Sequence, residues 1–160
     1  MIKYNHGTEE GLRYGIKRSP EWESTRIKHL QMEPQCAICG MLEFKKGLQV
    51  HHIFPFHYCV ALGRPDLELD HRNLITLCES EKEDKEPNHH LLIGHLNDFK
   101  SSNLNVKDDV RTYFKQDEKT IKSSTIWQVE EKRKLKPLDE MSEQEKQNFQ
   151  TLMNTILPKL

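Results

Sequence analysis

The segment from Cys36 to His95 contains four short motifs that decide the fold: CAICG at residues 36–40, VHHIFP at 50–55, NLITLC at 73–78 and NHHLLIGH at 88–95. All four cysteines and seven of the nine histidines of the chain lie in this segment. Thiolate sulfur and neutral imidazole nitrogen are the side-chain atoms that transition metals bind best. The sequence therefore predicts a domain built around metal ions, with the rest of the chain in support.

The cysteines have the spacing of a zinc site. Cys36 and Cys39 are three residues apart, so a tight turn can present both thiolates to one ion. Cys78 adds a third thiolate after a predicted strand, and a closed site needs one further ligand. The candidates for this ligand are Cys59 and the histidines, among which we favour His89 because it follows Cys78 across a charged stretch. A redox role for the cysteine pair is less favoured, since no βαβ pattern surrounds it.

A second group of side chains combines imidazoles with an amide, and consists of His51, His52, Asn73 and His90, with His95 nearby. Neighbouring residues on a strand point to opposite faces, so the adjacent histidines are expected to have different partners. One can bind a divalent metal while the other accepts a proton from water, as phosphodiester hydrolysis requires. An asparagine can hold the loop that carries the base through hydrogen bonds to its backbone.

Hydrophobic patterns predict an α+β fold with a small core. Strands are expected over residues 48–53 and 73–78, where β-branched and apolar residues are frequent. Residues 56–72 are expected to form a long loop, and a helix beginning at Asn88 is expected to carry the next three histidines. Further helices are expected between Ser19 and Pro34, over residues 106–116 and 124–135, and from Ser142, where Glu145 completes a capping box. A loose arm is expected over residues 1–17 and a solvated acidic excursion over residues 79–87.

Composition limits the class of protein. The 160 residues are 31% charged and 35% apolar, with a net charge of -1 and a mean hydropathy of -0.81. No apolar run approaches the ~20 residues of a membrane span. No hydrophobic leader opens the sequence, so we expect a cytoplasmic protein with reduced thiols.

The whole chain carries almost no net charge, so a nucleic-acid partner can be inferred only from local clusters of basic residues. Residues 100–136 hold ten Lys or Arg and six Asp or Glu, a mild basic bias that suits a solvated helical face as well as a DNA contact. The cations of the first predicted helix are further candidates for phosphate contacts, namely Arg18, Arg26 and Lys28.

In order and spacing, these motifs resemble the HNH nuclease family, whose core is a ββα-metal fold. The resemblance covers roughly residues 35–100 and rests on Cys36-x-x-Cys39, Val50-His51-His52-Ile53, Asn73-Leu74-x-x-Leu77-Cys78 and His89-His90. It is closest in type to the zinc-stapled branch, in which two Cys-x-x-Cys pairs clamp the core. Here Cys78, a ten-residue insertion and His89 take the place of the second pair, which implies that His89 stands in for the fourth cysteine.

The resemblance implies a role for each residue of the motif. His51 corresponds to a ligand of the catalytic metal, His52 to the general base, and Asn73 to the residue that holds the base. His90 corresponds to the last letter of the motif and is a further metal ligand. Colicin-type DNases carry one more histidine four residues later; here His95 follows His90 by five residues and is taken as the third ligand.

The chain is thus expected to have three segments: an N-terminal arm and helix (1–34), an HNH nuclease core with its zinc site (35–100) and a helical C-terminal extension (101–160). It is similar to small HNH proteins of bacteria and their phages. The leading hypothesis is an endonuclease acting on double-stranded DNA, with structural Zn²⁺ and catalytic Mg²⁺ or another divalent metal. Dimer contacts are one expected use of the helical extension.

Two rival hypotheses stay open. The first is a zinc-stabilised nucleic-acid-binding module without catalysis. The second is a protein-interaction module in which zinc is only a staple. No role is given to the remaining histidines, which are His6, His29, His57 and His71. Among them, His57 is close enough to the motif to approach the site.

Overall fold

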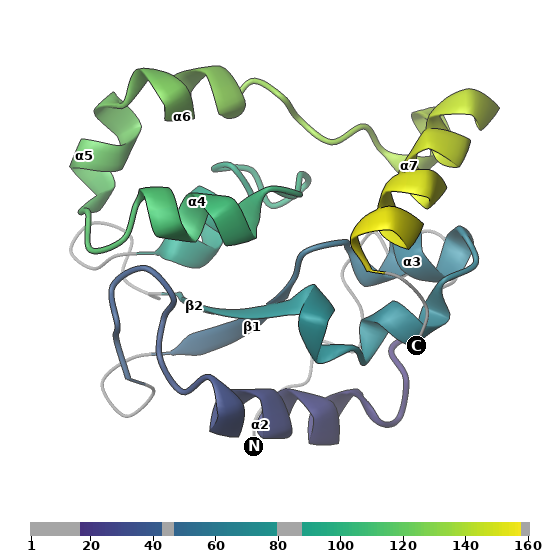
Figure 1. The fold of residues 1–160 in the computed structure, drawn as a ribbon, viewed down its shortest axis with the longest axis horizontal. Helices are drawn as coiled ribbons and strands as arrows, with labels where there is room; N and C mark the ends of the chain where they lie inside the picture. The colour runs from purple at the N-terminus through teal and green to yellow at the C-terminus, as the bar shows by residue number, and fades with distance from the viewer. Residues whose placement is uncertain (1–16, 43–46, 80–87, 158–160) are drawn as a thin grey trace.

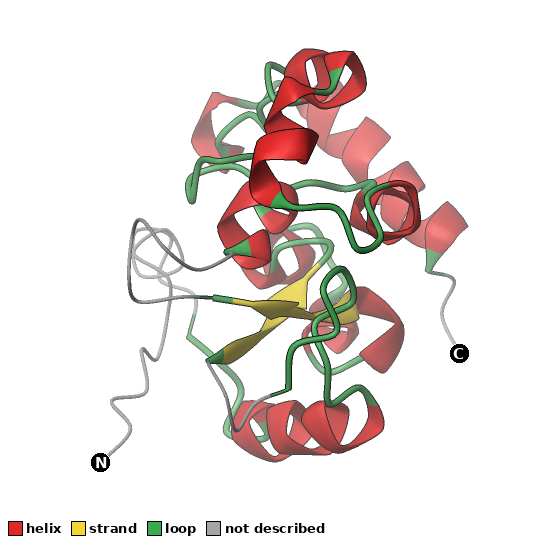
Figure 2. Ribbon diagram, turned by 90° about the vertical axis from the view of Figure 1, so that its left-hand side faces the viewer, coloured by secondary structure: helices red, strands yellow, loops and turns green. Residues whose placement is uncertain are grey.

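The computed structural model of the chain describes residues 17–42, 47–79 and 88–157, and its architecture is α+β as predicted. A two-stranded antiparallel sheet lies between helix α2 (Trp22–Met32) on one face and three helices on the other, α4 (Val106–Thr112), α5 (Glu118–Ser123) and α6 (Thr125–Glu130) (Figures 1 and 2). The predicted N-terminal arm apart from Lys17, and the acidic excursion apart from Glu79, lie outside the described residues.

The sheet pairs β1 (Leu48–His52) with β2 (Leu74–Cys78), as the strand patterns predicted. Val50 lies opposite Thr76 and His51 opposite Ile75. Every residue of β2 is buried, because both of its faces are covered, and this explains the nearly continuous apolar run of that strand.

A tight turn carries the first two cysteines to the edge of this sheet. The amide of Gly40 donates to the carbonyl of Cys36 (2.9 Å), and Gly40 has a φ of +72°, as the sequence predicted for this turn. The amide of Ala37 donates to the carbonyl of Thr76 (3.0 Å). The turn is therefore fixed beside β2 and its terminal Cys78.

Helix α2 (Trp22–Met32) packs on one face of the sheet. It begins later than expected: the hydroxyl of Ser19 accepts from the amide of Glu21 (3.2 Å), but this belongs to a turn that precedes the helix. Thr76 donates its hydroxyl hydrogen to the carbonyl of Glu33 (2.8 Å), so the end of α2 is bonded to the sheet.

The prediction of a long loop over residues 56–72 was wrong. Helix α3 (Phe56–Ala61) follows Pro55 directly, and two short 3₁₀ turns (Pro65–Glu68 and His71–Asn73) complete the connection to β2. Four of the six α3 residues are buried, so its six apolar and aromatic residues carry no one-sided pattern from which a helix could be recognised.

The expected helix after Asn88 is a five-residue π-helix, His90–Gly94. The side-chain oxygen of Asn88 accepts from the amide of Leu91 (2.9 Å), so the predicted capping residue acts at this end. His95 then ends the element, and Leu96 and Asn97 turn the chain with positive φ values of 50° and 63°.

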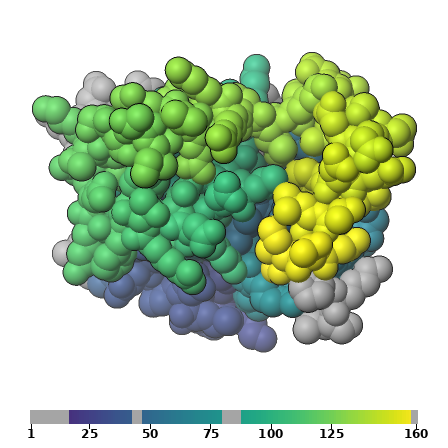
Figure 3. All heavy atoms as spheres, turned by 45° about the horizontal axis from the view of Figure 1, so that its top comes forward, coloured from purple at the N-terminus to yellow at the C-terminus, as the bar shows by residue number. Residues whose placement is uncertain are grey.

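The C-terminal part consists of α4 (Val106–Thr112), α5 (Glu118–Ser123), α6 (Thr125–Glu130) and α7 (Glu143–Ile156). Helix α5 was not expected; Asp117 caps it by accepting from the amide of Thr120 (2.7 Å). At α7, Ser142 accepts from the amide of Glu145 (3.1 Å), as the capping box predicted. Figure 3 shows that α4–α6 and α7 form two masses on one face with a hollow between them.

Buried side chains from all three predicted segments form one continuous hydrophobic cluster. Leu30 of α2, Leu77 of β2, Trp127 of α6 and Met153 of α7 all belong to it. The three segments therefore share one hydrophobic cluster in the described residues. None of the described helices is long and apolar enough to cross a membrane.

Candidate functional site

Three cysteines and one histidine meet at the edge of the sheet. One ligand atom from each of Cys36, Cys39, Cys78 and His89 lies within 4.8 Å of all the others. The Nδ1 atom of His89 is 3.2 Å from the sulfur of Cys78 and 3.7 Å from that of Cys36, and the sulfurs of Cys39 and Cys78 are 3.8 Å apart. These are the four side chains that the sequence predicted for the zinc site.

Cys59, the other cysteine considered for that site, lies elsewhere. Its thiol is buried and donates to the carbonyl of Phe54 (3.4 Å), and burial raises its pKa. It behaves as a small buried apolar residue.

The electrostatics of the cysteine cluster fit a bound cation. Hydrogen bonds from Cys39 and Cys78 hold the pKa of Cys36 far below its usual value, while hydrogen bonds with Cys36 and Cys39 raise the pKa of Cys78. Burial lowers the pKa of His89, but hydrogen bonds to Cys36 and Cys39 and their negative charge outweigh it and raise this pKa to about 9. Zn²⁺ suits three sulfurs and one imidazole nitrogen in a closed set.

A second cluster contains imidazoles alone. His51 comes from β1, His90 begins the π-helix and His95 follows its last residue, and one ring nitrogen from each lies within 4.8 Å of the others. The ring centroids are 4.7–5.2 Å apart. The five-residue spacing of His90 and His95 fits this arrangement, because a π-helix bonds residues five apart and brings them to the same side.

Hydrogen bonds fix the tautomers of two of these rings. The Nδ1 atom of His95 faces the carbonyl oxygen of Ser101 (2.6 Å), and the Nδ1 atom of His90 faces a carboxylate oxygen of Glu79 (3.2 Å). Both oxygens are acceptors, so each ring donates from Nδ1 and keeps a lone pair on Nε2. The two Nε2 atoms are only 3.1 Å apart. Two lone pairs at this distance repel unless a cation or a proton lies between them.

The third ring supports the same conclusion. The Nε2 atom of His51 is buried and has no hydrogen-bond partner within the described part of the chain. Burial, followed by the nearby His95 and His90, keeps the pKa of His51 well below its ordinary value. Burial also lowers the pKa of His95, to about 4. Neutral imidazoles with free lone pairs are suitable ligands for a divalent metal.

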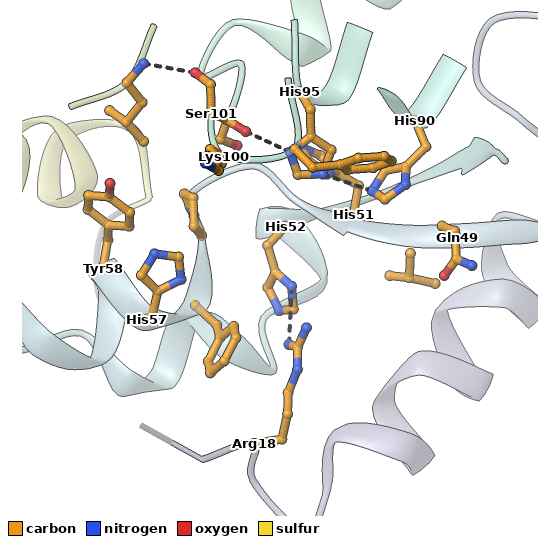
Figure 4. Close-up of a pocket in the computed structure, with 16 residues that line it drawn as sticks. Arg18, Gln49, His51, His52, His57, Tyr58, His90, His95, Lys100 and Ser101 are labelled. Atoms are coloured by element: carbon orange, nitrogen blue, oxygen red, sulfur yellow. Dashed lines mark hydrogen bonds between the residues drawn. The ribbon is translucent and has the colours of Figure 1, made fainter. Parts of the chain in front are cut away.

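His52 points away from this cluster, as alternation on a strand predicted (Figure 4). Its Nε2–H donates to the carbonyl of Glu68 (2.9 Å), which leaves the lone pair on Nδ1, 3.4 Å from Nη1 of Arg18. Burial, followed by the charge of Arg18, lowers the pKa of His52 to about 3. The ring is therefore neutral, with its hydrogen on Nε2 and its acceptor lone pair on Nδ1.

Asn73 holds the backbone around His52. Its side-chain oxygen accepts from the amide of Phe54 (2.8 Å), and its amide group donates to the carbonyls of Phe54 and Leu67 (3.0 Å each). Leu67 precedes Glu68, whose carbonyl receives the His52 ring. Asn73 is fully buried, so all of these bonds are shielded from water.

The three clustered imidazoles and His52 line one pocket, a cavity of about 180 Å³ (Figure 4). Arg18 enters it from the segment before α2, with its guanidinium 4.5 Å from the ring centroid of Trp22 and 4.1 Å from that of Phe56. Burial lowers the pKa of Arg18 to about 10, so it is still charged at neutral pH. His57 also lines the pocket, and burial lowers its pKa to about 4.

Motif reasoning missed the residues that orient the histidines. Glu79 and Ser101 hold His90 and His95 through their Nδ1 atoms, and Glu68 holds His52 through its carbonyl. Two of these partners act through backbone oxygens, for which no residue type is required. Only Glu79, directly after Cys78, could have been suspected from its charge.

The fold is a two-stranded antiparallel sheet with helices packed on it, and it holds two groups of Cys and His side chains that could each bind a metal ion. The model of the family described as HNH endonuclease matches residues 36–81, which confirms the predicted resemblance for that segment. The matched segment contains His51, His52 and Asn73 and ends before His89 and His90. Neither the curated proteins nor the solved structures include a match to this chain.

Proposed function

We propose that this chain is a divalent-metal-dependent endonuclease that hydrolyses DNA phosphodiester bonds. The observation that carries the proposal is that a cluster of three imidazoles and the separate imidazole of His52 line one pocket. His51, His90 and His95 converge as lone-pair donors, and His52 lines the same pocket with its lone pair on Nδ1, beside Nη1 of Arg18. An HNH endonuclease match over residues 36–81, which include His51 and His52, supports a nucleic-acid substrate.

The ligand roles follow from the donor atoms. Cys36, Cys39, Cys78 and His89 offer three sulfurs and one nitrogen, and we assign them to structural Zn²⁺. We assign His51, His90 and His95 to a second divalent ion, Mg²⁺ or Mn²⁺ being the first to test. When bound, that ion supplies positive charge for the phosphate and the departing oxygen.

The protein residues then perform the proton transfer. Nδ1 of His52 takes a proton from a water molecule while the water oxygen attacks phosphorus, and the bond from phosphorus to the 3′ oxygen breaks. The products are a 5′-phosphate and a 3′-hydroxyl, which takes up a proton. The carbonyl of Glu68 keeps the His52 ring in the productive tautomer, and Asn73 keeps that backbone in place.

Arg18 is placed to receive the phosphate. Its Nη1 atom lies next to the lone pair of His52, and its side chain is held between two aromatic rings. When a water molecule occupies the position facing Nδ1, this guanidinium is free to contact a phosphate oxygen, for which its planar fork is well suited.

Plasmid nicking with Mg²⁺ or Mn²⁺ tests the proposal. We expect metal-dependent nicking by the wild type and a loss of about a hundredfold or more in His52→Ala, because general-base catalysis contributes 10²–10⁴-fold. His71→Ala removes an imidazole outside the pocket and is the control. If His52→Ala nicks as fast as the wild type, the base assignment is wrong.

The alternative of a zinc-stabilised nucleic-acid-binding module is distinguished by the same assay. DNA binding without cleavage under any divalent metal, undiminished in His52→Ala, would favour the module over the enzyme. DNA affinity that does not fall with salt would instead support a protein-interaction role, because phosphate contacts release counterions.

A further inference from the structure

The loop after the π-helix presents an aromatic ring beside the histidine cluster. Phe99 is 53% exposed, and its ring centroid lies 5.1 Å from that of His95 and 5.8 Å from that of His90. Both contacts are tilted at 58°, so neither imidazole stacks on the phenyl ring. Single exposed apolar side chains are common, so exposure alone decides nothing. What matters here is that the exposed ring adjoins the ligands of the candidate metal site.

The loop that carries Phe99 is held firmly. Leu96 and Asn97 both have positive φ values, which L-residues rarely adopt and which cluster at functional sites. The amide of Asn97 donates to the carbonyl of Leu91 (2.9 Å), and the amide of Asn103 donates to that of Gly94 (2.9 Å). The ring is therefore presented by a fixed backbone.

The position of Phe99 matches a path for a nucleic-acid strand. Phe99 and the exposed Lys100 line the pocket that contains His52. Ser102 and Leu135 line both this pocket and a second cavity of about 410 Å³ in the hollow between α6 and α7. That cavity is also lined by three basic side chains, Arg133, Lys134 and Lys136, and by two acidic ones, Glu130 and Glu145, of which Glu145 pairs with Lys136 (3.1 Å).

We propose that Phe99 stacks on a nucleobase next to the scissile phosphate, with Lys100 on the adjoining phosphate, so that the preferred substrate is DNA whose bases are unstacked at the cut. This inference rests on the proposed function. A phenyl ring reaches the face of a base only when the base has left its stack, which costs least in single-stranded or mismatched DNA. Every base has such a face, so the contact tolerates any sequence.

The chain contains a matched control for this residue. Phe114 is 55% exposed and is also followed by a lysine, Lys115, but it lines neither cavity. Leucine at either position keeps an apolar side chain and removes the aromatic face. Phe99→Leu and Phe114→Leu therefore differ in place and not in chemistry.

The first measurement is cleavage of end-labelled oligonucleotides with Mn²⁺, as a single strand, a matched duplex and a duplex with one mismatch. We expect the wild type to cut the single strand and the mismatched duplex faster than the matched duplex. Phe99→Leu should lose about tenfold on the single strand and much less on the matched duplex. Phe114→Leu should match the wild type. Equal effects of both variants, or no effect of Phe99→Leu, would overturn the inference.

The second measurement does not require cleavage. A single strand containing 2-aminopurine is bound to the His52→Ala protein, with either Phe or Leu at position 99. Stacking on the phenyl ring quenches the fluorescent base, so we expect stronger quenching with Phe99. If no DNA is cut by the wild type, the proposed function fails, while unchanged quenching and affinity in the Leu variant would separately refute the stacking role of Phe99.

Discussion

A methyl group added at Gly94 tests whether the histidine cluster is a metal site. Gly94 is the last residue of the π-helix, and a Cβ there would lie 3.2 Å from Cε1 and Nδ1 of His51 and 3.2 Å from Cδ1 of Leu77. Gly94 is not among the described glycines with positive φ, so alanine meets no backbone strain. The substitution therefore acts by crowding the His51 ring.

The size of the effect follows from these distances. The ring must move by a few tenths of an ångström to regain ordinary van der Waals contact. Metal–ligand distances hold to within about 0.2 Å, so the lone pair of His51 no longer reaches a shared ion. We expect the affinity for the second ion to fall by roughly ten- to a hundredfold, as when the partners that orient a ligand are removed. Crowding destabilises the fold by about 1–3 kcal/mol. The higher helix propensity of alanine than of glycine offsets up to ~1 kcal/mol of this.

Calorimetric titration of the zinc-loaded protein with Mn²⁺ measures this affinity, with zinc content and plasmid nicking followed in parallel. We expect Gly94→Ala to keep its zinc and to lose Mn²⁺ binding and nicking together. Adding Leu77→Val relieves only the aliphatic contact and should restore neither. Wild-type Mn²⁺ affinity and nicking in Gly94→Ala would show that the reasoning about His51 is wrong.

Three further predictions follow from other sites. Cys78→Ser should remove one zinc equivalent per chain and lower the melting temperature, because the free energy of structural zinc binding contributes to folding. An unchanged zinc content by atomic emission would show that Cys78 is not a zinc ligand. Asn73→Ala removes three buried hydrogen bonds and should destabilise the fold by about 3–5 kcal/mol in urea unfolding. Burial, followed by a hydrogen bond with Asp109, raises the pKa of Glu130 to about 7, so its contribution to stability is present below pH 4.5 and is lost as the pH rises to 7. Glu130→Gln should therefore flatten the dependence of stability on pH in that window, and an unchanged slope would refute the shift.

The parts of the fold that depend on residue spacing could be predicted from the sequence. Two strands followed from their apolar patterns, and Ser142 marked the start of α7 through its capping pattern. The Cys-x-x-Cys pair and Cys78 indicated which side chains meet, because few residue types bind zinc. The roles of these residues in binding and catalysis stay predictions until metals and activity are measured.

The missed features have physical reasons. Helix α3 is too short and too evenly buried to have a periodic apolar face. The capping residue Asp117 marks the start of α5, but a six-residue helix gives little further pattern. The π-helix could not be anticipated from local propensity, since it depends on how His90 and His95 pack against β1. Arg18 reaches the pocket from outside the motif, so no spacing rule connects it to His52.

Two pairs of consecutive residues divide their side chains between the two clusters. Cys78 faces the sulfur cluster while Glu79 orients His90, and His89 faces the sulfur cluster while His90 faces the imidazoles. The two centres are thus separated by one peptide bond at two points of the chain. An ion bound at the first centre would restrain the backbone that presents the second, and thermodynamic linkage would make that influence mutual. Chelation of zinc should therefore weaken the hold on the other ion before the chain unfolds.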